Sequence, residues 1–151
     1  MNEPPYAEDV NYWKTGKSAP DVWIEKAIRE IASAGGEVRG EGFGREASTG
    51  RAAFMLSFDL GGERFKIVWP VLPTRRGEEY SARRQAATIL FYDVKARCLS
   101  AKVLGARAAF LSFLLLPDGR TAAQLAAPEL MEAIPRILAG DDPPRLTGPG
   151  D

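Results

Sequence analysis

Between Arg51 and Leu72, apolar and polar residues alternate on both sides of the pair Gly61-Gly62, a pattern typical of a β-hairpin. Two glycines tolerate the positive φ angles of a type I′ turn, so a two-residue loop would place Leu60 opposite Glu63. This register predicts cross-strand pairs on one apolar face: Phe58 with Phe65, Leu56 with Ile67, and Phe54 with Trp69. On the other face it pairs Asp59 with Arg64 and Ser57 with Lys66. A slip of one residue would turn the aromatic side chains to water, so we expect a firm register.

Two other stretches have the spacing of amphipathic helices. The first runs from Ser18 to the pair Gly35-Gly36, and the second, Tyr80 to Leu104, has no internal glycine or proline. Between the first helix and the hairpin, glycine recurs at alternate positions from Glu37 to Glu46. No helix follows these glycines, as a phosphate-binding loop would require. They therefore predict a bent or bulged edge strand.

The apolar run from Ala108 to Leu116 predicts a strand that is buried on both faces and ends at the turn Pro117 to Arg120. A strand that follows a long helix makes a crossover, which would set it parallel to a hairpin strand. Residues 121–127 and 128–139 predict two further helical segments. The predicted fold class is α+β, close to α/β, in the order α-β-β-β-α-β-α. An antiparallel hairpin and a crossover strand share one sheet, and helices pack on it.

A chain of 151 residues, 45% of them hydrophobic, fits one domain with a real core. We expect a flexible arm over residues 1–17, a single domain over residues 18–140 and a disordered tail over residues 141–151. The arm carries Tyr6, Tyr12 and Trp13. These aromatic side chains either pack back onto the domain or stack on bases or a partner chain.

The chain has no histidine and one cysteine, Cys98. The usual zinc sites, Ser-His-Asp triads and Cys-His dyads lack their ligands or base, so we expect no cofactor and no metal site of these kinds. No apolar run approaches the roughly 20 residues of a membrane-spanning helix, and the first residues do not resemble a signal peptide. A lone cysteine suits a reducing compartment. We expect a cytoplasmic protein that does not contact a membrane.

The net charge is zero, but the charges are segregated along the chain. Residues 64–107 hold ten basic and three acidic residues, a net charge of +7, while the segments before and after them are acidic. Such segregation indicates an anionic partner such as nucleic acid, unless folding scatters the charges into a mixed surface. On the long helix, Arg84, Lys95 and Lys102 would lie along one line beside the apolar face. They either contact phosphates or extend over apolar packing. The candidate nucleic-acid-binding residues are Arg75, Arg76, Arg83, Arg84, Lys95 and Lys102.

The predicted element order resembles the core of restriction-endonuclease-like nucleases. These enzymes carry a metal-binding Asp and a Glu/Asp-x-Lys motif on their second and third strands. Asp59, Glu63 and Lys66 lie in the corresponding region, although Glu63 is three residues before Lys66 instead of two. The resemblance implies that two carboxylates and a lysine hold Mg²⁺ for phosphodiester hydrolysis.

A second resemblance covers Ala19 to Leu125. Its motifs are Phe58 to Leu60, Trp69 to Pro73, Val94 to Arg97, and Leu116 to Arg120. Through them the chain is similar to a family of small uncharacterised proteins of phages and mobile elements. The family brings no activity, but its context implies handling of DNA or RNA.

The sequence as a whole predicts a non-catalytic nucleic-acid-binding accessory protein of a phage or mobile element. The alternatives are a protein-interaction or self-association module, which would use the hairpin face, the aromatic arm or an edge strand, and a metal-dependent nuclease.

Overall fold

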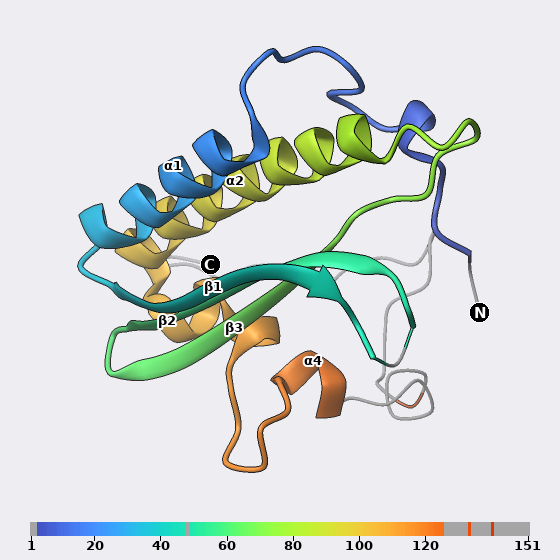
Figure 1. Cartoon of the computed structure of the whole chain (residues 1–151). Coiled ribbons are helices and arrows are strands. Elements are labelled where there is room, and N and C mark those ends of the chain that lie inside the picture. The colour runs from blue at the N-terminus through green and yellow to red at the C-terminus, as the bar shows by residue number, and fades with distance from the viewer. Residues whose placement is uncertain (1–2, 48, 126–132, 134–139, 141–151) are drawn as a thin grey trace.

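A computed structural model describes residues 3–47, 49–125, 133 and 140. Within this part of the chain a three-stranded antiparallel sheet, in the order β1-β2-β3, is packed under two long helices (Figure 1). The fold class is therefore α+β. The elements are η1 (Ala7–Asp9), α1 (Pro20–Ser33), β1 (Glu37–Arg45), β2 (Ala52–Leu60), β3 (Glu63–Pro70), α2 (Glu79–Leu104), α3 (Ala106–Ala109), η2 (Leu111–Phe113) and α4 (Ala122–Leu125).

The hairpin of β2 and β3 has the predicted register throughout. Leu60 pairs with Glu63, Phe58 with Phe65, and Phe54 with Trp69. The turn residues Gly61 and Gly62 have φ angles of 61° and 81°, which L side chains rarely adopt. The predicted apolar face is buried against the helices, and the Asp59 and Arg64 pair lies on the opposite face.

The two turn glycines provide a test of the hairpin. A Cβ atom added at Gly62 meets open space, whereas one at Gly61 would lie 2.9 Å from the Cβ of Ala106. Gly62→Ala is expected to cost about 1–2 kcal/mol of unfolding free energy, because alanine is strained at positive φ. Gly61→Ala should cost more, because it adds a steric contact to the same strain. Urea denaturation of both variants measures the difference, and equal costs would contradict the close approach of α3 to the turn.

Strand β1 is the glycine-rich edge strand that the sequence predicts. Among the described strands it pairs with β2 only, and the register shifts between Val38 and Gly40, so Arg39 occupies a β-bulge. Gly40, Gly42 and Gly44 alternate on the sheet face that turns away from the helices, opposite Ser57, Met55 and Ala53. The bulge and the charged side chains of β1 are common means of protecting an edge strand from pairing with other chains.

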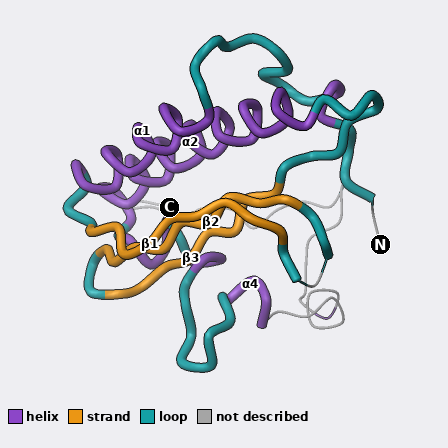
Figure 2. Tube along the Cα trace, viewed as in Figure 1, coloured by secondary structure: helices purple, strands orange, loops and turns teal. Residues whose placement is uncertain are grey.

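Helices α1 and α2 lie side by side and run in the same direction across one face of the sheet (Figure 2). The contact between Trp23 and Phe91 near the start of α1 places the two helices in register. The core between the helices and the sheet is built from Ile31, Leu56, Phe58, Phe65, Ile67, Leu90 and Val94, all less than 2% exposed. None of the described helices is long and apolar enough to span a membrane.

The predicted crossover strand over residues 108–116 is wrong. Gly105, at φ 93°, ends α2, and the chain then turns through α3 and η2 instead of extending. Small residues allow the short helix, and it brings the fully buried Phe110 against the rings of Phe58 and Phe65. Two isolated bridges remain in this run: Leu114 lies antiparallel to Phe65, and Leu115 lies antiparallel to Thr121. The apolar run therefore closes the end of the core, and the described sheet has no parallel strand.

The N-terminal segment packs on the domain along residues 5–16. The backbone N–H of Ala7 donates to the carbonyl of Pro73 at 2.8 Å, and Ala7 is fully buried. The buried side-chain amide of Gln85 donates to the carbonyls of Ala7 and Asn11 at 2.8 and 3.0 Å. Contacts of residues 5–16 thus join the predicted N-terminal arm to the domain. The predicted helix over residues 128–139 and the predicted tail over 141–151 lie outside the described residues, apart from residue 133.

Candidate nucleic-acid interface

The six predicted basic residues fall into two groups along the chain. Arg75 and Arg76 lie in the loop before α2, and Arg83 and Arg84 lie in its first two turns. Lys95 and Lys102 lie on the same line of α2 as Arg84, but about 16 and 27 Å further along the helix axis. The structure therefore brings the four arginines to one end of the domain and leaves the two lysines towards the other.

The folded chain adds two arginines that the charge count did not select. In this antiparallel sheet the last residues of β1, the first residues of β2 and the last residues of β3 lie side by side at the same end of the sheet. Helix α2 begins above that end (Figure 1). Arg45 ends β1, and Arg51 immediately precedes β2. Both lie beside the connection between β1 and β2 and outside the basic segment 64–107. We call Arg45, Arg51, Arg76, Arg83 and Arg84 the arginine end.

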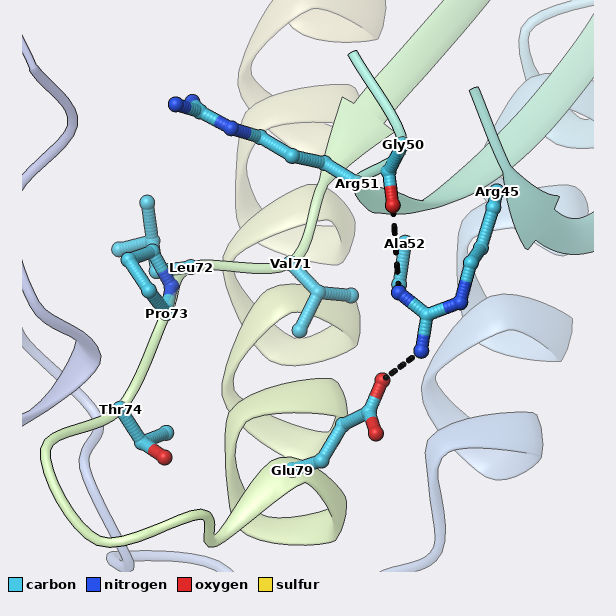
Figure 3. A pocket seen from close by; sticks show the side chains of 9 residues that line it. All are labelled: Arg45, Gly50, Arg51, Ala52, Val71, Leu72, Pro73, Thr74 and Glu79. Carbon is cyan, nitrogen blue, oxygen red and sulfur yellow. Dashed lines mark hydrogen bonds and ion pairs between the residues drawn. The ribbon is translucent and has the colours of Figure 1, made fainter. Parts of the chain in front are cut away.

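A pocket of about 280 Å³ opens at the arginine end. Arg45, Arg51, Val71, Thr74 and Glu79 are among its lining residues (Figure 3). The guanidinium of Arg45 donates to the carbonyl of Gly50 and to the carboxylate of Glu79, both at 3.3 Å. The side chain of Arg51 extends away from Glu79. The pocket thus has one arginine that is held in place and one that is directed outwards.

Two further arginines are supported by aromatic rings. The guanidinium of Arg83 lies over Phe43 of β1, 4.0 Å from the ring centroid. That of Arg84 lies 5.2 Å from the centroid of Tyr80 and donates to the carbonyl of Gly16 at 2.9 Å. A guanidinium stacked on a ring keeps its charge and the N–H groups at its rim.

Arg75, in contrast, is already engaged within the protein. Its guanidinium donates to both carboxylate oxygens of Asp9 and lies over the ring of Tyr6. The hydrogen bond lowers the pKa of Asp9 and raises the pKa of Arg75. The charge of Arg75 is therefore largely neutralised by η1, and of the adjacent arginines only Arg76 is exposed without a carboxylate partner among the described residues.

Ion pairing leaves the middle segment basic. Its three acidic residues are all paired: Glu78 with Lys14, Glu79 with Arg45, and Asp93 with Arg97. Two of these partners come from outside the segment, so they do not reduce its excess of basic groups. Within the described chain, six basic residues of the segment form no ion pair: Lys66, Arg76, Arg83, Arg84, Lys95 and Lys102.

The residues of the nuclease hypothesis lie near the hairpin turn but serve as ion-pair partners. Asp59 accepts hydrogen bonds from the Nε atoms of Arg64 and Arg39, at 2.7 and 2.8 Å. Glu63 accepts two from Arg107, at 2.8 and 2.9 Å. Lys66 lies on the outer sheet face opposite Ser57. In the described part of the chain no group of acidic, histidine or cysteine side chains is arranged to hold a metal ion. The geometry therefore favours a structural role for these carboxylates.

The two arginines lower the pKa of Asp59 from its ordinary 3.8 to about 2. The carboxylate thus stabilises the fold above pH 3.8, and this contribution is lost as the pH falls towards about 2. Asp59→Asn is expected to unfold at lower urea concentration than the parent protein at neutral pH, and the difference should shrink below pH 3.8. Urea titrations at a series of pH values measure it. A difference that persists unchanged to about pH 2 would contradict the role of the ion pairs.

The aromatic residues of the N-terminal segment pack back onto the domain, which is one of the two arrangements that the sequence allows. Tyr12 stacks on Tyr92 of α2, with ring centroids 5.3 Å apart, and Trp23 lies 6.0 Å from the same ring. Trp13 is half-buried and packs against the hydrophobic core. These rings consequently fasten the N-terminal segment to the helical layer.

Comparison with protein-family models, with curated proteins and with solved structures found no match for this chain.

Proposed function

We propose that this protein is a non-catalytic nucleic-acid-binding accessory protein that contacts the phosphate backbone through the arginine end. The family resemblance of its sequence motifs supports a role in a phage or mobile element. Lys95 and Lys102 lie too far along α2 to contact the same few phosphates as Arg83. The two lysines therefore lie outside the arginine end and outside the proposed interface.

One observation carries the proposal: five arginines from three separate segments come together at one end of the domain, and within the described part of the chain only Arg45 is in an ion pair there. Arginine binds phosphate through a planar fork of N–H donors, and its charge is weakly hydrated. Phosphate contacts supply most of the affinity of non-specific nucleic-acid binding. The arrangement therefore suits an extended polyanion better than a small neutral ligand.

The alternative of a protein-interaction module is favoured by a separate observation, the exposed apolar side chains on α2 described below. It concerns a different surface, so the two functions are compatible. The nuclease alternative gains no support from the hairpin carboxylates, because Asp59 and Glu63 accept hydrogen bonds from arginines.

Fluorescence anisotropy tests the proposal with labelled oligonucleotides of about 20 nucleotides, longer than the binding site of one small domain. Single- and double-stranded DNA and RNA are titrated separately at low salt. We expect saturable binding to at least one of the four and a steep loss of affinity as salt is added, because bound phosphates release counterions. If none of the four binds at low salt, the proposed function is wrong.

A further inference from the structure

The outward side of α2 carries a line of apolar residues in its second half. Tyr92, Ala96, Leu99 and Val103 follow one another at spacings of four, three and four residues. They therefore lie along one side of the helix, as the seam positions of a coiled coil do. Leu99 is 65% exposed and Val103 78%, whereas Tyr92, at the start of the line, is 42% exposed and stacks on Tyr12 of the N-terminal segment. We call these four residues the apolar seam.

The apolar seam is not part of the core. The core residues of this half of α2, such as Leu90 and Val94, face the sheet, and α1 lies along one side of the helix. A groove of about 470 Å³ runs between the two helices and is lined by Tyr92, Leu99 and Cys98. Contiguous exposed apolar surface on a small domain commonly marks an interaction site.

Charge distinguishes one flank of the seam. Lys95 and Lys102 line the same groove, each one position before a seam residue, and neither forms an ion pair among the described residues. Glu30 of α1 is the acidic residue in that lining. Two lysines against one carboxylate leave the groove basic, so a partner that buries the seam gains from carrying carboxylates beside its apolar residues.

We propose that the apolar seam binds an amphipathic α-helix of a partner protein, with acidic residues flanking its apolar ridge. The spacing of the seam matches the knobs-into-holes packing of a second helix, and the two lysines supply the charge complement. Leu99 and Val103, the most exposed residues of the seam, supply most of the apolar contact, and Lys95 and Lys102 select acidic helices over basic ones.

A second copy of this chain fits the same seam less well. In an antiparallel pair of α2 helices the two lysines of one copy would lie opposite those of the other. In a parallel pair Lys95 would lie opposite Ser100, which offers no charge. An acidic helix satisfies both lysines in either direction.

The site is separate from the proposed nucleic-acid interface. Leu99 lies 15 residues beyond Arg84, about 22 Å along the helix axis. A bound helix and a bound nucleic acid therefore occupy different parts of α2, and the test below does not depend on nucleic-acid binding.

Designed peptides of about three heptads test the proposal by fluorescence anisotropy with the full chain. One peptide has leucine at the seam positions and glutamate on the flanks, and a second has lysine in place of every glutamate. We expect the glutamate peptide to bind at least about tenfold more tightly than the lysine peptide. Lys95→Glu/Lys102→Glu should reverse this order, whereas Lys17→Glu/Lys66→Glu, with the same charge change elsewhere, should preserve it. Leu99→Ser/Val103→Ser should weaken both peptides about tenfold or more, and exposed positions keep this change compatible with folding.

Four results would overturn the proposal. They are no binding of the glutamate peptide, equal affinity for both peptides, a preference that the lysine substitutions leave unchanged, and binding that survives the serine substitutions. Sedimentation velocity of the chain alone identifies the other occupant: a dimer that Leu99→Ser/Val103→Ser dissociates would assign the seam to self-association. Co-sedimentation with anionic phospholipid vesicles that needs the same residues would assign it to a lipid surface.

Discussion

Replacing Phe58 by alanine is expected to lower the free energy of unfolding by about 3–5 kcal/mol, the usual range for a large core side chain. Phe58 is fully buried in the second half of β2. Its ring lies 5.6 Å from that of Phe65 and 5.1 Å from that of Phe110. The substitution therefore removes apolar burial and two aromatic contacts together, and leaves a cavity between the sheet and the chain after α2. Urea denaturation followed by tryptophan fluorescence measures the loss.

Met55→Ala is the matched control, because Met55 lies on the same strand with its side chain 46% exposed on the other face. Its cost should stay below about 1 kcal/mol. Domains of this size are commonly stable by about 5–15 kcal/mol, so Phe58→Ala removes a large share of the total. Equal costs for the two variants would show that the helix-facing side of the hairpin is not the main core.

The second large effect concerns the proposed interface. Replacing Arg51, Arg76 and Arg83 together by alanine is expected to weaken nucleic-acid binding about tenfold to a hundredfold at low salt, because three phosphate contacts are lost. Arg84 is kept in this variant, since its hydrogen bond to Gly16 also fastens the N-terminal segment. Anisotropy titrations against the parent protein measure the change.

A charge-matched control replaces Lys26, Arg29 and Arg120 by alanine. Lys26 and Arg29 lie on α1 and Arg120 lies in the turn before α4, and none of them belongs to the arginine end. The control variant loses the same formal charge, so it should bind within about threefold of the parent protein. An equal loss in both variants would mean that net charge, and not the arginine end, governs binding.

The hairpin was predictable because local and cross-strand signals agree in this sequence. Gly61-Gly62 sets the turn, and the pairing that follows from it places apolar residues together on one face and Asp59 with Arg64 on the other. Each pair supports the same register, so an alternative pairing would lose several contacts at once. The edge strand was predictable for a similar reason, since alternate glycines allow the bulge at Arg39.

The prediction of a strand from Ala108 to Leu116 was wrong because apolar content indicates burial but not backbone conformation. A short apolar segment fits a buried strand and a buried turn equally well by periodicity. Here Gly105 stops α2, and the chain must cover the open end of the core at once, which Phe110 does from a tight turn. The parallel strand, and with it the element order shared with nucleases, is absent from the described sheet.

The interface was only partly predictable from charge along the chain. The sequence identified Arg76, Arg83 and Arg84 through the basic segment, but Arg45 and Arg51 join them through strand pairing, which a linear count does not include. Neither did the sequence show that Asp9 would neutralise Arg75. The cause of this neutralisation is the buried Gln85. Its side-chain amide holds the N-terminal segment, and with it Asp9, close to the loop that carries Arg75.

The most direct test of the central proposal is the slope of log affinity against log salt concentration for the parent protein and for the Arg51, Arg76 and Arg83 triple variant. For duplex DNA each lost phosphate contact should reduce the slope by about 0.9, so the variant is expected to be shallower by about 2.7. A shallower slope with lower affinity would assign these arginines to phosphate contacts. A slope that does not change, whatever happens to the affinity at low salt, would contradict the proposal that the arginine end binds the nucleic-acid backbone.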